Sequence, residues 1–188
     1  MTGAEIISVA RIARVNHAGE YGAIRIYGAQ HAFARLFWPN VATKIAELRG
    51  HEVEHCRLFR EAMRQRNIRP CRAMYLWSFG GYALGAVTAV LGPKMIWACT
   101  EAVEDAVHHH LAAQLHYLHT RDAALFALVK DIQSEEEGHL SLAIAEKGAP
   151  SRLTRVAEAV VRVSVHCVVW LSTWGGSTRM RRDLRVAA

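Results

Sequence analysis

Two short stretches of this chain each carry a glutamate that is followed three residues later by a histidine. The pairs are Glu52 with His55 and Glu136 with His139. Residues three apart lie on the same face of an α-helix, so a carboxylate and an imidazole at this spacing can bind one metal ion. The sequence therefore predicts two helices that each present a Glu-x-x-His ligand pair.

Each pair is preceded by another glutamate at the same distance along the chain. Glu20 precedes Glu52 by 32 positions (52 − 20), and Glu104 precedes Glu136 by 32 positions (136 − 104). Two single carboxylates and two Glu-x-x-His pairs are the ligand set of a dinuclear centre in a four-helix bundle. Carboxylates with one imidazole per metal suit iron or manganese far better than copper. We therefore predict that two metal ions bind to Glu20, Glu52, His55, Glu104, Glu136 and His139.

One of these stretches also fits a different metal site. Residues 51–55 read H-E-V-E-H, which matches the H-E-x-x-H signature of zinc metalloproteases. In that interpretation His51 and His55 bind zinc, and Glu52 is the general base. The zinc site leaves Glu20, Glu104 and the second Glu-x-x-His pair without a role, whereas the dinuclear centre uses all of them.

The composition favours a helical protein of one domain. At 188 residues the chain is long enough to bury a substantial core, and it is 52% hydrophobic with only 4 prolines, which favours helix. The cysteines are far apart, which argues against a disulfide scaffold or a thiolate metal site and fits a reducing compartment. The N-terminus lacks the pattern of a cleavable signal. The cysteines are Cys56, Cys71, Cys99 and Cys167.

The apolar periodicity predicts an all-α protein with a four-helix bundle, in a domain at 1–175. We expect Pro39 to end the first helix and Gly148 to end the last helix of the bundle, on whose buried side we place Ile144. Two glycines flank Glu20 inside the first helix and cost about 1 kcal/mol each, so we expect a neighbouring helix or ligand to approach closely there. The predicted bundle helices span about 3–37, 41–67, 95–119 and 122–147.

Two further segments, 73–93 and 156–174, are unusually apolar. The first has no charged residue but contains four glycines, so we expect a short helix in one membrane leaflet, or a lid over the bundle, rather than a span. The second belongs to a final helix that starts at Ser151, and it either packs on the bundle or lies in a membrane interface. The basic tail at 176–188 suits a membrane surface or is a solvated end, and we find no nucleic-acid motif.

Taken together, four motifs closely resemble the demethoxyubiquinone hydroxylase family of ubiquinone biosynthesis, over roughly residues 11–172. They read R-V-N-H-A-G-E at 14–20, E-V-E-H at 52–55, C-T-E-A-V-E at 99–104 and E-E-E-G-H at 135–139. The resemblance implies a ferritin-like di-iron monooxygenase, which hydroxylates the ring of demethoxyubiquinone (2-polyprenyl-3-methyl-6-methoxy-benzoquinol) with dioxygen and electrons from NADH.

The resemblance also implies roles for individual residues and a place in the cell. Two iron ions bind to the six residues named above, Glu52 and Glu136 can bridge them, and His110 lies near the site, where it can take part in proton or electron movement. No substrate-binding residue is assigned. The protein is expected peripherally on the cytoplasmic face of the cell membrane, or on the inner mitochondrial membrane in a eukaryote. An accessory protein and a homo-oligomer are both compatible with this picture.

Three positions depart from the family pattern. Asn16 stands where an aspartate is expected, Ser134 where an aspartate is common, and Leu111 where an aromatic residue is frequent. None of these changes removes a ligand, so they affect the surroundings of the centre rather than the centre itself. The competing interpretations are a ferritin-like ferroxidase or iron-storage protein, the zinc protease, and a non-catalytic membrane adaptor.

Overall fold

The computed structural model is an all-α bundle, and it describes residues 1–172, 178–179 and 182. Within this part of the chain there are six helices and no strand. The predicted basic tail at 176–188 falls almost entirely outside the described residues. The helices are α1 (Gly3–Phe37), α2 (Pro39–Gln65), α3 (Met74–Val90), α4 (Pro93–Leu118), α5 (Ala123–Lys147) and α6 (Arg152–Ser172).

Two prolines begin helices, which shifts two predicted boundaries. Only Trp38 separates α1 from α2, and Pro39 is the first residue of α2, where we expected the helix to begin at 41. Pro93 likewise begins α4, two residues before the predicted start. Proline suits the first position of a helix because its φ is already helical and its missing N–H would have no partner there.

Polar caps fix the start of the later helices. Oδ1 of Asp122 accepts a hydrogen bond from the backbone N–H of Leu125 at 2.9 Å, which caps α5. Oγ of Ser151 accepts one from the backbone N–H of Thr154 at 3.1 Å, so the predicted cap of α6 is confirmed. Gly148 follows the last residue of α5 with a φ of 67°, a left-handed conformation that suits glycine.

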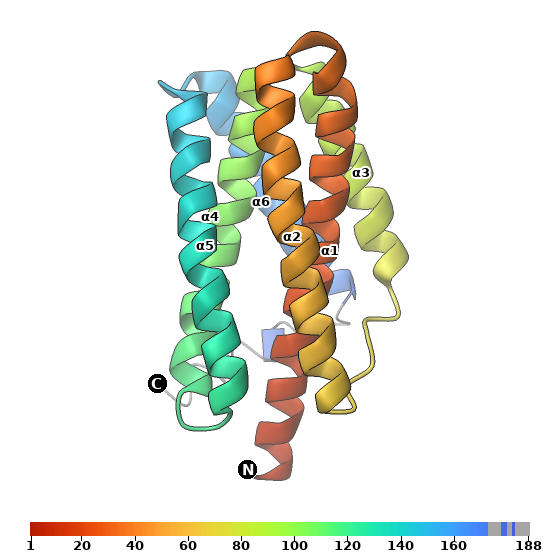
Figure 1. Ribbon diagram of the computed structural model, residues 1–188, viewed down its shortest axis with the longest axis vertical. Helices are drawn as coiled ribbons and strands as arrows, with labels where there is room; N and C mark the ends of the chain where they lie inside the picture. The colour runs from red at the N-terminus through yellow and green to blue at the C-terminus, as the bar shows by residue number, and fades with distance from the viewer. Residues whose placement is uncertain (173–177, 180–181, 183–188) are drawn as a thin grey trace.

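The bundle is made of two helical hairpins that face each other. α1 packs along α2, and α4 packs along α5, while α1 with α4 and α2 with α5 make far fewer direct contacts. Figure 1 shows α3 beside α1, and α6 on the far side of the bundle from α2. α6 packs mainly on α4. The space between the hairpins therefore holds side chains from all four bundle helices.

Glycines allow α3 to lie close against α1. A Cβ on Gly22 would lie 2.7 Å from Cε3 of Trp77 in α3, and one on Gly81 would lie 2.7 Å from the carbonyl oxygen of Gly22. A Cβ on Gly85 would collide with the carbonyl oxygen of Ile26. The close approach predicted beside Glu20 is therefore confirmed at Gly22, where the approaching element is α3, but not at Gly19, where an added Cβ would have no neighbour within 4 Å.

The buried face of α5 differs from the one we expected near both ends of the helix, since Ala124, which we also placed on that face, is exposed. Leu125 and Ile132 are buried as predicted, but Ile144 is 51% exposed. The buried face instead continues to Lys147, whose Nζ lies 2.5 Å from Oε2 of Glu101 in α4 and 2.5 Å from Oε1 of Glu158 in α6. This ion-pair cluster joins α6 to the bundle, because it bridges three helices.

The outer faces of α3 and α6 expose large apolar side chains. The described part of the chain contains no helix with the length and hydropathy that a bilayer crossing requires. The exposed residues on α3 include Tyr75, Phe79, Tyr82, Val87 and Val90, and those on α6 include Leu153, Val156, Val160 and Val163.

Candidate metal centre

The structure brings all six predicted ligand side chains into one cluster between the hairpins. Each of them is at most 4% exposed. α1 contributes Glu20 and α4 contributes Glu104, while α2 and α5 each contribute a Glu-x-x-His pair. The ligand atoms form two groups of four within which all atoms lie within 4.8 Å of one another. The first group is Glu20, Glu52, His55 and Glu136, and the second is Glu52, Glu104, Glu136 and His139.

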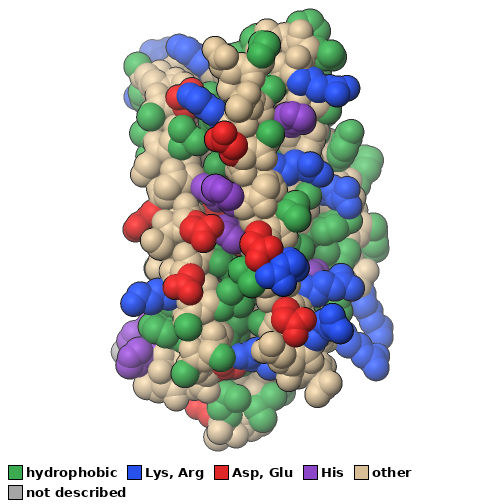
Figure 2. Space-filling model, in the orientation of Figure 1, with side chains coloured by type: hydrophobic (Ala, Val, Ile, Leu, Met, Phe, Trp, Pro, Cys, Tyr) green, Lys and Arg blue, Asp and Glu red, His purple; other side chains and the backbone are tan. Residues whose placement is uncertain are grey.

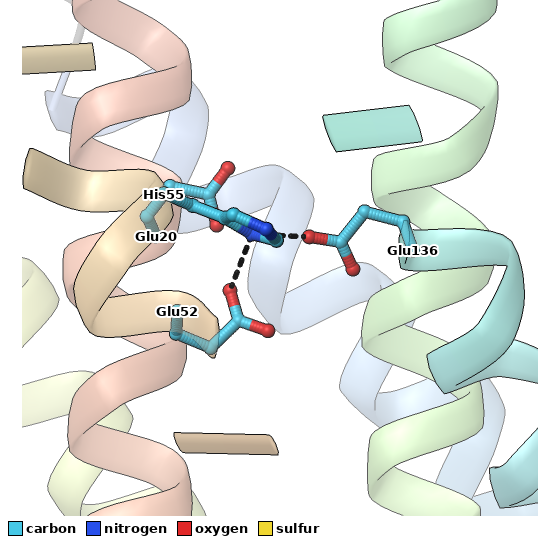
Figure 3. A group of neighbouring side chains, drawn as sticks. All are labelled: Glu20, Glu52, His55 and Glu136. Carbon is cyan, nitrogen blue, oxygen red and sulfur yellow. Dashed lines mark ion pairs between the residues drawn. The ribbon is translucent and has the colours of Figure 1, made fainter. Parts of the chain in front are cut away.

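Both histidines turn the same ring nitrogen toward the shared carboxylates, Glu52 and Glu136. Nδ1 of His55 lies 3.0 Å from Oε1 of Glu136 and 3.8 Å from Oε2 of Glu52. Figure 3 shows these two ion pairs, with Glu20 beside them. Nδ1 of His139 lies 3.1 Å from Oε2 of Glu136 and 3.3 Å from Oε1 of Glu52. Each shared carboxylate therefore offers one oxygen to each histidine.

Several atoms of this cluster have no well-aligned hydrogen-bond partner among the described residues. Oε1 of Glu52, Nδ1 of His55 and Oε1 of Glu136 are buried without a well-aligned hydrogen bond, although the last two are only 3.0 Å apart. Buried polar atoms in proteins are nearly always paired. Four carboxylates with two imidazoles at these distances would find their missing partners in two divalent cations, so the residues fit a dinuclear metal centre.

The protonation of the cluster follows from its burial and crowding. Burial, reinforced by neighbouring carboxylates, raises the pKa of Glu20 and of Glu104 well above the ordinary value. Burial lowers the pKa of His55, but the contacts with Glu136 and Glu52 outweigh this effect and raise it to about 10. The same balance raises the pKa of His139 to about 9. Burial opposes ionisation of Glu136, but the contacts with both histidines hold its pKa below the ordinary value.

Outside this cluster, three side chains hold the candidate ligands. Nε2 of His55 lies 3.0 Å from Oε2 of Glu135, and Nε2 of His139 lies 2.8 Å from Nδ1 of His51. The Tyr27 hydroxyl donates to Oε1 of Glu104. Figure 2 shows histidine and acidic side chains gathered on the surface where α2 and α5 face each other.

Sequence reasoning assigned His51 only to the zinc site and did not single out Tyr27. His51 is exposed and belongs to neither of the two four-ligand groups found among the described residues. Tyr27 lies seven residues after Glu20, on the same face of α1, and this spacing was the available signal. The partner of His51 lies on another helix, so no local pattern could have identified it.

A cavity of about 400 Å³ adjoins the cluster between α1, α3, α4 and α6. Glu20 lines it, and so does His110, which stands on the cavity wall rather than among the six clustered side chains. Most of the remaining wall is apolar. It includes Ala23, Trp77, Leu84, Val103, Val165 and Val168.

Asn16 also lines this cavity, and its environment accounts for one departure from the family pattern. Its Nδ2 donates to Oε1 of Gln114 at 2.7 Å, and Nε2 of Gln114 donates to Oδ1 of Asn16 at 2.9 Å. Both side chains are buried. This reciprocal pair needs an amide at each position, because each side chain both donates and accepts. Asparagine at position 16 can form the pair with Gln114, whereas an ionised aspartate could not donate. Leu111 is 1% exposed and packs in the core beside the same cavity.

Comparison with known proteins supplies a family and named relatives. The family described as "Ubiquinone biosynthesis protein COQ7" matches residues 8–172. The "NADPH-dependent 3-demethoxyubiquinone 3-hydroxylase, mitochondrial" of Homo sapiens is 35% identical over 169 residues, which cover 88% of this chain and 77% of the human protein. The "3-demethoxyubiquinol 3-hydroxylase" of Rhodospirillum rubrum is 32% identical over 162 residues, which cover 86% of this chain and 76% of that protein.

Proposed function

The chain belongs to the ubiquinone biosynthesis COQ7 family, and from this premise we propose that it is a di-iron monooxygenase of the ferritin-like kind that hydroxylates the ring of demethoxyubiquinol. The observation that carries the proposal is the apolar cavity that reaches Glu20. A centre that only oxidised or stored iron would need access for ions and oxygen. A cavity of about 400 Å³ with an apolar wall suits instead the ring and first isoprenoid units of a quinone.

In this proposal the six clustered side chains hold the metal ions. Glu20 and His55 would hold one ion, and Glu104 and His139 would hold the other. Glu52 and Glu136 would serve both ions, which their membership of both groups supports. Two bound iron ions would supply the redox chemistry that passes electrons to dioxygen. One oxygen atom enters a ring C–H bond and the other leaves as water. The reductant provides two electrons and one proton, and the second proton comes from solvent.

The residues around the cavity orient the substrate and exclude water. Trp77, Leu84 and Val103 present apolar surface to the quinone. Besides its pair with Gln114, the Asn16 amide has a second N–H that it can donate one helical turn from Glu20. His110 is the candidate for moving a proton at the cavity wall, since its ring can both donate and accept. The electrons come from a reduced nicotinamide. We expected NADH, whereas the name of the human relative specifies NADPH.

We further propose that the protein binds peripherally to the membrane that holds its quinone. α3 and α6 flank the cavity, and both expose apolar side chains on their outer faces. A long isoprenoid chain could then pass from the lipid into the cavity without crossing water. The human relative is mitochondrial by name, which fits the inner mitochondrial membrane in a eukaryote, and the bacterial counterpart is the cytoplasmic face of the cell membrane.

The first test is metal content and hydroxylation together. Protein purified anaerobically and loaded with ferrous iron should hold close to two ions per chain and convert a short-chain demethoxyquinol, with NADH and NADPH each supplied as reductant. Glu136→Ala should lose most of the iron and the activity, and Glu137→Ala, which changes an exposed neighbour, should keep both. Two irons with mineral formation but no ring hydroxylation would favour the ferroxidase. One zinc ion that is unaffected by Glu136→Ala would favour the protease.

A further inference from the structure

The two histidines of the candidate centre differ in the side chain that contacts Nε2, the ring nitrogen that points away from the shared carboxylates. Nε2 of His55 faces the carboxylate of Glu135 at 3.0 Å, whereas Nε2 of His139 faces Nδ1 of His51 at 2.8 Å. The rings of His51 and His139 also stack, with centroids 5.1 Å apart and an interplanar angle of 13°. One imidazole is therefore held by an acid and the other by a second imidazole.

Glu135 and His51 occupy equivalent positions in the two hairpins. Glu135 directly precedes Glu136, and His51 directly precedes Glu52, the other shared carboxylate. Each reaches across to the histidine of the opposite hairpin, because His55 lies on α2 and Glu135 on α5, while His139 lies on α5 and His51 on α2. The six clustered residues are thus arranged symmetrically, whereas this pair of surrounding positions differs between the two hairpins.

The geometry fixes how the protons must be placed if the inward nitrogens bind metal. An imidazole that binds through Nδ1 carries its proton on Nε2 and donates it outward. The Glu135 carboxylate can accept that hydrogen bond from His55 as an anion. His51 can accept the one from His139 only through an unprotonated Nδ1, as a neutral ring. A charged acceptor forms the stronger hydrogen bond and makes the ligand more basic.

A second contact weakens the same side of the centre. The Tyr27 hydroxyl donates to Glu104, which belongs to the group that contains His139. A hydrogen bond from a neutral donor withdraws negative charge from a carboxylate, so the Glu104 oxygens bind a cation less strongly. The shared residues Glu52 and Glu136 serve both groups and do not distinguish them.

We propose that the two metal positions bind their ions with unequal strength, and that the position of Glu20 and His55 binds more tightly. At the weaker position, His51 is the positioning residue for His139. This inference rests on the proposed dinuclear centre. It predicts that the first ion binds at the position of Glu20 and His55 and the second at the position of Glu104 and His139. The contacts made by Glu135, His51 and Tyr27 would determine this order.

The test is an anaerobic titration of the metal-free protein with ferrous iron, in which binding is followed by calorimetry and each bound ion by Mössbauer spectroscopy with ⁵⁷Fe. The unmodified protein should bind two ions in two resolved steps, and the first ion should give a single quadrupole doublet. His51→Ala should weaken the second step by about 10- to 100-fold and leave the first unchanged. His51→Glu should strengthen the second step and so bring the affinities of the two steps closer together. The reason is that His55 and His139 would then both face a carboxylate.

Matched variants separate this effect from a general loss of charge or fold. Glu135→Gln should weaken the first step, whereas Glu137→Gln and His116→Ala change exposed residues of the same types and should alter neither step. Two ions bound in a single step, with the same response to every variant, would overturn the inference and leave the dinuclear centre standing. Fewer than two ions bound by the unmodified protein would overturn the proposed centre, and this inference with it.

Discussion

At the scale of single residues, the centre combines four carboxylates and two imidazoles in the buried interior of the bundle. Without metal, the cluster can reduce its negative charge only by holding protons. The pKa values of Glu20, Glu104, His55 and His139 are all raised, so the folded metal-free protein retains protons that the unfolded chain would release. Metal ions would replace those protons. The response to pH therefore depends on whether metal is bound.

We predict that the metal-free protein loses stability as pH rises from 6.5 to 8.5. The pKa of His55 is about 10 and that of His139 about 9, above the ordinary 6.5, so the stability they contribute is complete below pH 6.5 and is lost as pH rises through the folded-state values. In the pH range where a histidine is protonated in the folded state but not in the unfolded chain, each of the two lowers the free energy of unfolding by about 1.4 kcal/mol for every pH unit of increase. Iron-loaded protein should show the opposite trend, because metal binding requires the ligands to be deprotonated.

Thermal unfolding in anaerobic buffer, at both pH values and with and without ferrous iron, measures the two trends directly. The double variant His55→Gln/His139→Gln serves as the control, since it should remove most of the pH dependence from the metal-free protein. Parallel trends with and without iron would contradict the assignment of these imidazoles as ligands.

The residues that meet at the centre could be predicted from the sequence, but their surroundings could not. The three-residue spacing of Glu136 and His139 specifies one face of one helix, whatever that helix packs against. The contact of His51 with His139, by contrast, depends on how far α2 and α5 are rotated and separated. Lys147 shows a missed local signal, since it continues the face of Glu136, His139 and Ala143 at helical spacing and is buried on it.

At the scale of helices, α3 acts as a wall of the cavity and depends on its glycines. We predict that Gly85→Ala destabilises the protein by about 1–3 kcal/mol, because the added methyl group would collide with the carbonyl oxygen of Ile26 and lie 3.0 Å from Cβ of Ala29. Gly80→Ala is the matched control, since its methyl group would lie 3.7 Å from Cγ2 of Val168, an ordinary contact.

Chemical denaturation of both variants in the same metal-bound state gives the comparison. Gly80→Ala should leave the free energy of unfolding unchanged or raise it by up to about 1 kcal/mol, since alanine favours helix over glycine. Equal stability of the two variants would mean that α3 does not need its close approach to α1.

The helices themselves were largely predictable, and the errors have a common cause. The span 3–37 agrees with α1, and the other predicted boundaries differ from the observed ones by a few residues. Apolar periodicity locates the middle of a helix, whereas its ends depend on capping and on proline. We interpreted Pro39 only as the end of a helix, although it also begins the next one. Periodicity does not show which helices pack against each other, so the contact between α3 and α1 could be found only in the structure.

At the scale of the whole molecule, we predict that the outer face of α3 binds membrane. Phe79 is 79% exposed and Tyr75 is 69% exposed. Replacing both by serine removes apolar area worth about 1.5–3 kcal/mol for each side chain that enters the lipid. Binding to vesicles of phosphatidylcholine and phosphatidylglycerol should therefore fall at least tenfold, as measured by co-sedimentation.

Val53→Ser provides the comparison, because Val53 is 48% exposed on α2, away from α3 and α6, and should not affect vesicle binding. Circular dichroism of all variants should be unchanged. If the serine variants of α3 bind vesicles as well as the unmodified protein, the apolar face serves another purpose, such as contact with an accessory protein or a second copy.

The distribution of ligands between the two hairpins has a consequence for the history of the chain. Each group takes three of its four members from one hairpin and the fourth from the other. One hairpin alone thus offers an incomplete set to either ion, whereas two identical hairpins across a two-fold axis would complete both. The equal spacing in the two halves is what a gene duplication and fusion of such a dimer would leave. Once joined, the copies could diverge, and divergence of this kind would account for the difference between His51 and Glu135.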